Sequence, residues 1–251
     1  MLLLIALFCM TSAYEEQCFP NLKVPTNLTP GEFEVSVQHR FYGRIDDGGR
    51  SFFGFANSVS PSFGLRYHVW RTLEATTAFY AADKEVEVGA SYAYLNPSLY
   101  FKLQAEGVYY DFSAFDADNK EFRKHAGCVL FALQSYPIIQ SFSPTVNAGY
   151  DFDKRKWGLG LGLNVILVEG LDVFGEYFPL LEKNKDSTAL ATKNVFSFGL
   201  KISTAGHHFL LFLQNSVNNP SIGTIGSRHV MFGSDNNNLH FGFEIERLFA
   251  F

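Results

Sequence analysis

Charged side chains at alternating positions are the residues of this chain with the clearest capacity for chemistry. Glu85 and Glu87 alternate with valines. Glu244 and Glu246 alternate with large apolar residues in the closing segment. Because neighbouring residues of a β-strand point to opposite faces, each pair of carboxylates shares one face. Ionisable groups gathered on the inner face of a barrel could select ions or solutes, or could neutralise one another.

The same alternation assigns a larger set of polar side chains to one interior surface. Acidic residues outnumber basic ones in this set, so an open passage would prefer cations mildly. In a closed interior the same residues would form a network of ion pairs, and the sequence leaves both possibilities open. The predicted lumen-lining residues are Glu32, Glu34, Arg40, Arg44, Arg66, His68, Glu74, Glu85, Glu87, Lys102, Glu106, Asp172, Glu176, Lys201, His240, Glu244 and Glu246.

Few other residues have a spacing that indicates catalysis or metal binding. His39 has the parity of the apolar face, as a lipid-side catalytic histidine would, but no serine is placed convincingly beside it. His207 and His208 are adjacent and would point to opposite faces, which disfavours shared metal ligation. Residues 116–119 lack the glycine and the distal glutamate of a calcium loop. The chain has no nucleophile elbow, P-loop or dinucleotide fingerprint. We therefore expect no enzyme, catalytic residue, cofactor or metal.

Period-two alternation extends from Gly31 to the end of the chain and predicts the elements that position these residues. It indicates about twelve strands of roughly 10 to 13 residues, which suits the ~9–11 tilted residues that cross a bilayer. Near Gly107 the parity changes, which predicts a bulge. The predicted strands cover residues 32–44, 59–69, 73–82, 85–95, 99–112, 126–136, 143–153, 157–168, 171–181, 194–203, 207–216 and 238–251.

The amino-acid composition limits the environments in which these strands could lie. Phe (27) and Tyr (12) are abundant, yet the mean hydropathy is only +0.01, too low for a helical membrane protein. Strands with one apolar and one polar face reconcile the two values. The formal net charge of −5, without a basic patch, argues against a nucleic-acid partner. A soluble up-and-down barrel with an apolar interior would give the same alternation and is the rival fold.

The connections and the chain end favour the membrane alternative. Long or charged links, such as 45–55 and 217–237, mostly alternate with tight ones, such as 71–72 and 169–170. Outer-membrane barrels have this asymmetry, with short turns and both termini in the periplasm. The chain also ends on Phe251 after an alternating strand, like the terminal strand read by the barrel-assembly machinery. The fold class is thus all-β: a single antiparallel transmembrane β-barrel of about 12 strands.

The N-terminus predicts export. Residues 1–13 form an apolar run that ends in small residues and is typical of a signal peptide. Residues 14–30 are expected to form a periplasmic N-terminal segment, and residues 31–251 the barrel. Cys18 and Cys128 could form a disulfide or remain free thiols.

Several motifs also carry a resemblance to a known family. They are the glycine-led segment Gly31–Phe41 with its His-Arg-Phe ending, Gly175–Tyr177, Ala205–Phe209 followed by Asn215-Ser216, and the closing strand with Phe-Gly-Phe. Together they resemble an uncharacterised family of outer-membrane β-barrels found mostly in Bacteroidetes-type bacteria, over most of the chain from about Pro25. Ala205 replaces the first glycine of that family's Gly-Gly-His turn. The resemblance implies a location in the bacterial outer membrane and brings no substrate.

The function expected from these patterns is a non-enzymatic pore or transport-related barrel for small solutes. Its expected partners are outer-membrane lipids, the barrel-assembly machinery and small solutes, with no nucleic acid. Two alternatives remain: a closed structural barrel that docks a partner through its loops, and a membrane-embedded lipid enzyme.

Overall fold

The computed structural model describes most of the chain beyond its N-terminal end. It covers residues 18–56, 58–81, 84–96, 98, 100–115, 121–136, 141–153, 155–179, 181, 194–204, 206–215 and 238–251. The predicted signal peptide (residues 1–13) and the loop 116–119 lie outside the described residues. In the described part, no helix is long and apolar enough to cross a membrane.

The described residues form twelve strands, as the alternation predicted, and a short 3-10 helix, η1 (Ile45–Ser51), in the first long link. Most predicted ends differ from the observed ones by only a few residues. The strands are β1 (Glu32–Arg44), β2 (Val59–Trp70), β3 (Leu73–Tyr80), β4 (Glu85–Asn96), β5 (Phe101–Phe115), β6 (Glu121–Ser135), β7 (Phe142–Asp151), β8 (Lys156–Val168), β9 (Leu171–Phe178), β10 (Val195–Thr204), β11 (His207–Gln214) and β12 (His240–Ala250).

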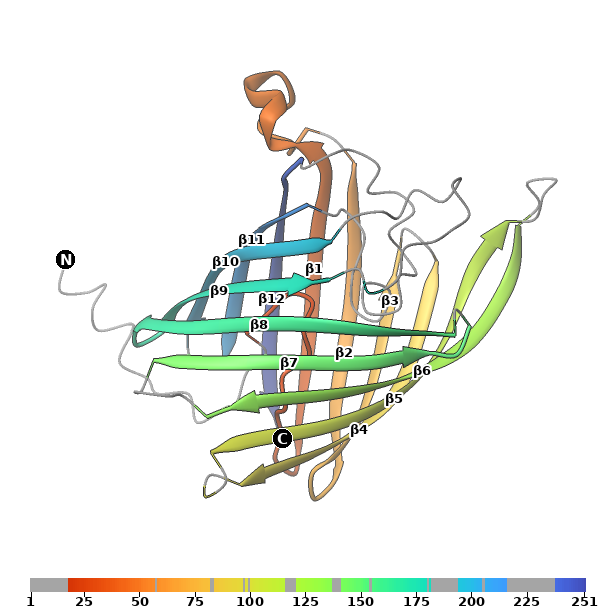
Figure 1. Cartoon of the computed structure of the whole chain (residues 1–251), viewed down its shortest axis with the longest axis vertical. Helices are drawn as coiled ribbons and strands as arrows, with labels where there is room; N and C mark the ends of the chain where they lie inside the picture. Colours follow the sequence, from red (N-terminus) through yellow and green to blue (C-terminus); the bar gives the residue numbers. More distant parts are fainter. Residues whose placement is uncertain are drawn as a thin grey trace.

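All twelve strands pair antiparallel with their sequence neighbours, and β1 pairs with β12 to close the barrel (Figure 1). The closing register sets Glu32 opposite Ala250 and Val37 opposite Ile245. The start of β1, the end of β12 and the short β2–β3 and β8–β9 turns therefore lie at one end of the barrel. In outer-membrane barrels this end faces the periplasm, and we call it the periplasmic end.

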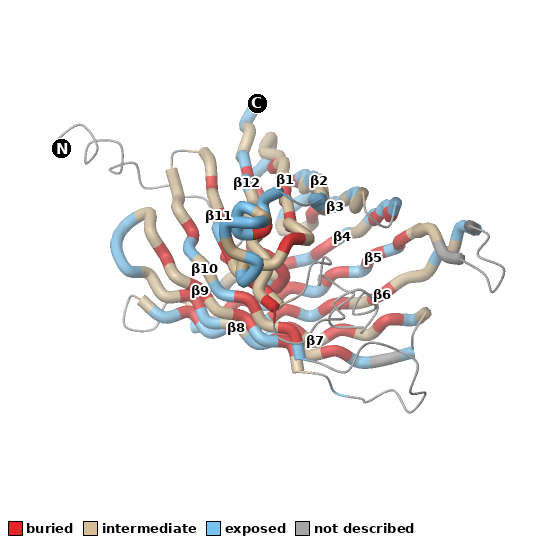
Figure 2. Tube along the Cα trace, turned by 90° about the horizontal axis from the view of Figure 1, so that it is seen from above, coloured by how far each residue is buried: buried red, intermediate tan, exposed pale blue. Residues whose placement is uncertain are grey.

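Buried and exposed residues alternate along the strands (Figure 2), and the buried ones are largely polar. In β4, for example, Glu85 and Glu87 are buried whereas Val86 and Val88 are exposed. A soluble barrel would bury its large apolar side chains and expose its charges. The observed arrangement is the reverse, so it excludes the soluble rival and indicates an outer face that contacts lipid.

Exposed aromatic side chains lie near both ends of the barrel wall. Trp70 and Tyr100 lie at the periplasmic end, and Phe152 and Trp157 lie at the opposite end. Two such girdles mark the two interfaces of a membrane. The Arg71 guanidinium lies 4.4 Å from the centroid of the Trp70 ring, as expected for a cation at an interface.

The predicted bulge near Gly107 is wrong. β5 pairs without a register shift with both β4 and β6 through this point. Val108 and Tyr110 simply continue the inward parity, and they pack with Cys128 as a small apolar cluster inside the barrel. The parity only seemed to change because apolar side chains occupy inward positions there.

Candidate functional site

The chain before β1 lies inside the barrel. Cys18, Phe19, Leu22, Val24 and Leu28 are each at most 5% exposed. Residues 18–30, which we call the plug segment, appear as the red trace within the ring of strands (Figure 1). These residues were predicted to form part of a periplasmic N-terminal segment. The structure instead places residues 18–28 in the lumen, where their apolar side chains are buried.

The contacts of the plug segment trace a loop that enters and leaves at the periplasmic end. Gln134, near the periplasmic end of β6, donates a hydrogen bond to Cys18 Sγ (3.5 Å). Further along, the backbone N–H of Lys23 donates to Asn147 in the middle of β7 (2.7 Å). The backbone N–H of Leu28 then donates to Glu74, near the periplasmic end of β3 (2.6 Å). The plug segment is thus a re-entrant loop whose turn lies midway up the lumen.

One side of the plug segment packs against an apolar wall. Phe19 and Leu22 belong to a buried cluster completed by residues of the strands: Leu130, Phe174, Phe178, Val195, Leu210 and Phe212. A Cβ added to Gly162 would lie 2.4 Å from Leu22 Cδ1 and 2.9 Å from Phe19 Cζ. The glycines of β8 therefore make room for bulky side chains, and those side chains come from the plug segment. Burial of each contributes about 1.5–3 kcal/mol.

Polar groups fix the turn of the plug segment. The fully buried Arg40 guanidinium donates to Asn21 Oδ1 and to the backbone carbonyl of Pro20 (3.4 Å). Glu176 accepts hydrogen bonds from the Asn21 amide and from the Leu22 backbone N–H (3.0 Å). Opposite charges of the barrel wall thus hold three consecutive residues of the turn, Pro20 to Leu22. Hydrogen bonds to charged groups contribute about 1.5–3 kcal/mol each.

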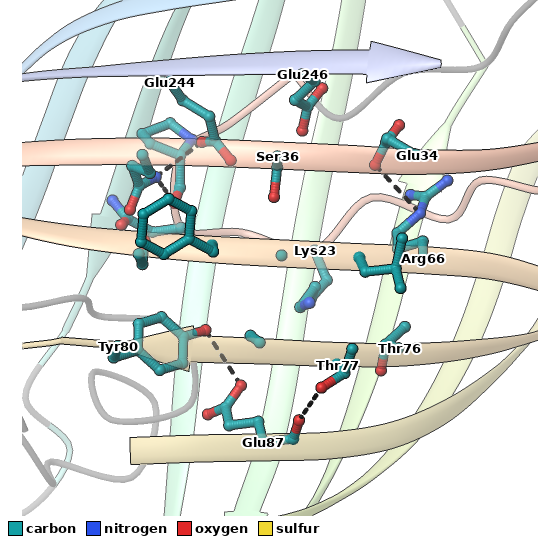
Figure 3. Close-up of a pocket in the computed structure, with 18 of the residues that line it drawn as sticks. Lys23, Glu34, Ser36, Arg66, Thr76, Thr77, Tyr80, Glu87, Glu244 and Glu246 are labelled. Atoms are coloured by element: carbon teal, nitrogen blue, oxygen red, sulfur yellow. Dashed lines mark hydrogen bonds and ion pairs between the residues drawn. The ribbon is translucent and has the colours of Figure 1, made fainter. Parts of the chain in front are cut away.

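The other side of the plug segment borders a cavity of about 120 Å³ (Figure 3). Its charged lining consists of Lys23, Arg66 and five carboxylates: Glu34, Glu87, Glu106, Glu244 and Glu246. Arg66 pairs with Glu34 at 3.4 Å and also with Glu74 at 3.6 Å. Lys23 Nζ lies 3.7 Å from Glu106, whose charge raises the pKa of Lys23. The two cations therefore do not neutralise the whole wall.

The predicted lumen-lining residues fall into two groups in the structure. Most are buried in the lumen: Glu34, Arg40, Arg66, His68, Glu74, Glu85, Glu87, Lys102, Glu106, Asp172, Glu176, Lys201, Glu244 and Glu246 are all buried or nearly so. Glu32, Arg44 and His240 lie at strand ends and are partly exposed. Arg44 pairs with the exposed Asp46, whose pKa this hydrogen bond lowers. The alternation predicts which residues of a strand face inward. It does not predict whether an inward residue lies at the exposed end of the strand or in its buried middle.

Closure of β1 onto β12 does not set an arginine directly opposite the β12 carboxylates. The register sets Gln38 opposite Glu244, and Gln38 donates to that carboxylate at 2.8 Å. Arg40 lies opposite Gly242; its guanidinium donates to the plug segment and also interacts electrostatically with Glu244.

Sequence reasoning missed several uncharged residues that hold the plug segment. Gln38, Asn147 and Gln134 contact it through side-chain amides and are each at most 5% exposed. Each has the inward parity of its strand, but only charged side chains were considered. The same alternation, applied to amide side chains as well as to carboxylates, would have predicted that they face the lumen.

The cysteines and histidines singled out above have structural surroundings. Cys18 and Cys128 are both buried free thiols, and burial raises the pKa of Cys18 to about 11. His39 lies in the sheet between Pro61 and Phe243 and contacts the Phe243 ring edge-on. His208 is fully buried whereas His207 contacts Arg247, so the two point to opposite faces as expected. No group of three possible metal ligands occurs among the described residues.

A comparison with protein families agrees with this architecture. Residues 131–249 match the model of a family described as membrane bound beta barrel domain (DUF5777). None of the curated proteins compared with the chain matches its sequence. Among solved structures, the KdgM porin is similar with a TM-score of 0.48 and 10% identity, covering 86% of this chain and 99% of that one. The NanC porin is similar with a TM-score of 0.48 and 9% identity, covering 87% of this chain and 99% of that one. The Acinetobacter baumannii outer membrane protein Omp33 is similar with a TM-score of 0.45 and 10% identity, covering 87% of this chain and 98% of that one.

The family match confirms the resemblance found in the closing half of the sequence, over a shorter range than expected. It covers β7 to β11 fully, together with the end of β6 and most of β12. The remaining strands belong to the same closed sheet. They also have an apolar outer face and a charged inner face. The chain is therefore an outer-membrane-type β-barrel whose residues 131–249 match the membrane bound beta barrel domain family.

Proposed function

We propose that the protein is a non-enzymatic, transport-related barrel that passes small solutes, with a preference for cations, along one side of its plug segment. The observation that carries this proposal is the asymmetry of the lumen. The plug segment packs closely against β8 and its neighbours, whereas an acid-rich cavity remains beside β1 to β4. Rings of carboxylates favour cations in channels.

The plug segment makes the resting barrel narrow. A passage for solutes then requires the segment to shift away from the charged wall, where hydrogen bonds and an ion pair hold it. The Thr26 hydroxyl accepts a hydrogen bond from Arg66 (2.7 Å), and Lys23 pairs with Glu106. We therefore expect brief, infrequent openings in the intact protein.

Single-channel recording of the full-length, refolded protein in a planar bilayer tests the proposal. Heat-modifiable gel migration first establishes that the sample is folded. The expected result is discrete conductance steps whose reversal potential in a salt gradient favours cations. Anion preference would contradict the proposed role of the carboxylates, and conductance without discrete steps would indicate leaking bilayers.

A closed structural barrel that docks a partner is the second candidate, favoured by the anchored plug segment itself. This candidate predicts silence in the same recording, both for the intact protein and for a variant with a weakened plug segment. Silence of both samples, each folded, would replace the transport proposal with the structural one.

An enzymatic role has less support. His39 faces the lipid side, but its direct partners in the sheet are Pro61 and Phe243, which supply neither a nucleophile nor a base. We propose that His39 is a neutral residue of the apolar face. Lipase and acyltransferase assays of the wild type and of His39→Phe test this, because activity that depends on His39 would contradict it.

The interactions of the outer surface complete the proposal. Lipids of the outer membrane would contact the exposed apolar face, and the barrel-assembly machinery would recognise β12. The ring of Phe251, at the end of that strand, is 95% exposed. Phe251→Ser should therefore lower the yield of assembled barrel in cells, while refolding in detergent continues.

A further inference from the structure

We propose that the cavity beside the plug segment is a binding site for a small organic ammonium ion. The inference rests on the proposed transport function, whose solute class it names. Its chemistry depends on the charges, size and unpartnered groups of the cavity.

Glu246 supplies the clearest sign of a missing cation. It is 2% exposed, and its buried Oε2 accepts no hydrogen bond from any residue that the structure describes. It lines the cavity together with Ser36, its neighbour across the β1–β12 pair (Figure 3). A buried carboxylate oxygen without a hydrogen bond is costly, because burial removes water without supplying a donor. A bound ammonium ion would provide that donor.

The lining of the cavity holds two cationic side chains and five carboxylates. Lys23 pairs with Glu106, and Arg66 is shared between Glu34 and Glu74. Glu87 accepts a hydrogen bond from the Tyr80 hydroxyl (3.1 Å), and Glu244 accepts one from the Gln38 amide. Neutral donors orient these carboxylates but do not cancel their charge. A cation is therefore the complementary ligand, and an anion is not.

The arrangement of the acceptors favours an ammonium group over a bare metal ion. The described residues contain no group of three side chains that could hold a metal. Instead, the carboxylates lie around the cavity together with the hydroxyls of Ser62 and Thr76. Separate acceptors suit a cation that carries several N–H donors pointing in different directions.

The chain itself places one ammonium group in this cavity. Lys23 extends from the plug segment to Glu106, so an alkylammonium is already accommodated on one part of the wall. The volume of about 120 Å³ corresponds to roughly four water molecules at ~30 Å³ each, enough for an ion of a few heavy atoms. Lys23 is then a tethered competitor that a free ligand meets on entry.

Isothermal titration of the refolded, full-length protein in detergent with ethylammonium chloride tests the site. Potassium chloride and tetramethylammonium chloride at equal ionic strength serve as comparison ligands, because tetramethylammonium has similar charge but no N–H donor. We expect saturable binding of ethylammonium alone. No saturable binding to folded wild type, or equal binding of all three cations, would overturn the proposal.

Two variants are expected to change the affinity for ethylammonium in opposite directions. Misfolding would weaken binding in both. Glu246→Gln should weaken ethylammonium binding at least about tenfold, as loss of one charge-assisted hydrogen bond implies. Lys23→Met should strengthen it, because the competing ammonium is removed while the backbone contacts with Asn147 remain. Asp47→Asn, in the exposed loop, removes the same charge as Glu246→Gln and should leave binding unchanged.

Each outcome of the variants decides the question. Unchanged affinity in Glu246→Gln, or weaker binding in Lys23→Met, would overturn the proposed site. The titration needs no open passage, so a barrel that never conducts can still bind ethylammonium. Conductance without ethylammonium binding would overturn this inference alone and leave the proposed transport function standing.

Discussion

Of the two walls of the lumen that border the plug segment, one is apolar and the other is charged. Towards β8, glycines admit Phe19 and Leu22 into an apolar cluster from which water is excluded. Towards β1 to β4, charged side chains surround a cavity that the plug segment does not fill. Close packing is intolerant of change, whereas a polar cavity can exchange water for a solute. The first wall therefore holds the plug segment, and the second provides the space for function.

The largest expected effect comes from removing the main apolar contact of the plug segment. Leu22→Ala should weaken its docking by about 2–5 kcal/mol, as for other buried leucines. Reaction of the buried Cys18 thiol with a maleimide, in a background with Cys9→Ser and Cys128→Ser, measures the fraction of protein whose plug segment is undocked. The labelling rate should rise at least about tenfold. Leu163→Ala, on the exposed face of β8, is the matched control and should label like the parent.

The polar anchor of the turn should matter somewhat less. Arg40→Gln removes the guanidinium that donates to Pro20 and Asn21, at a cost of about 1.5–3 kcal/mol. The same thiol-labelling assay should show an intermediate rate. Arg44→Gln, at the exposed rim, serves as control. Equal labelling of the two arginine variants would show that Arg40 does not hold the plug segment.

Filling the space that the plug segment needs tests the apolar wall from the other side. Gly162→Leu overpacks against Leu22 and Phe19 and should cost about 1–3 kcal/mol. Gly175→Leu adds the same side chain where no atom lies within 4 Å of the new Cβ. Faster Cys18 labelling is expected only for Gly162→Leu. A similar response of both variants would mean that sheet distortion, not plug displacement, exposes the thiol.

The smallest effect is expected far from both walls. The Asp46 pKa is lowered by its hydrogen bond to Arg44, so this pair stabilises the folded state above the ordinary aspartate pKa. That contribution is lost as the pH falls through the lowered pKa. Because both side chains are exposed, Asp46→Asn should leave the gel-shift temperature and its pH dependence almost unchanged. A large change would mean that the rim helps to hold the lumen closed.

The strands and their faces could be predicted because alternation is a local property of the sequence. Glu85 and Glu87 share a face wherever the strand lies, and the neighbouring valines share the other. The position of the plug segment could not be predicted in this way. Its place depends on the fit between Leu22 and Gly162, which are far apart in sequence, and residues 18–30 have no periodicity of their own. The glycines at alternate positions of β8 were the one local sign that something bulky lies opposite them.

A reversible tether between the plug segment and the barrel wall tests the central claim most directly. Lys23→Cys and Asn147→Cys, with Cys9→Ser, Cys18→Ser and Cys128→Ser, place two thiols where the wild-type residues exchange hydrogen bonds of 2.7 and 2.9 Å. A short, reducible cross-linker would join them, and single-channel current would be recorded before and after reduction. We predict silence while the tether is intact and conductance steps after reduction. Equal conductance in both states would contradict a passage controlled by the plug segment.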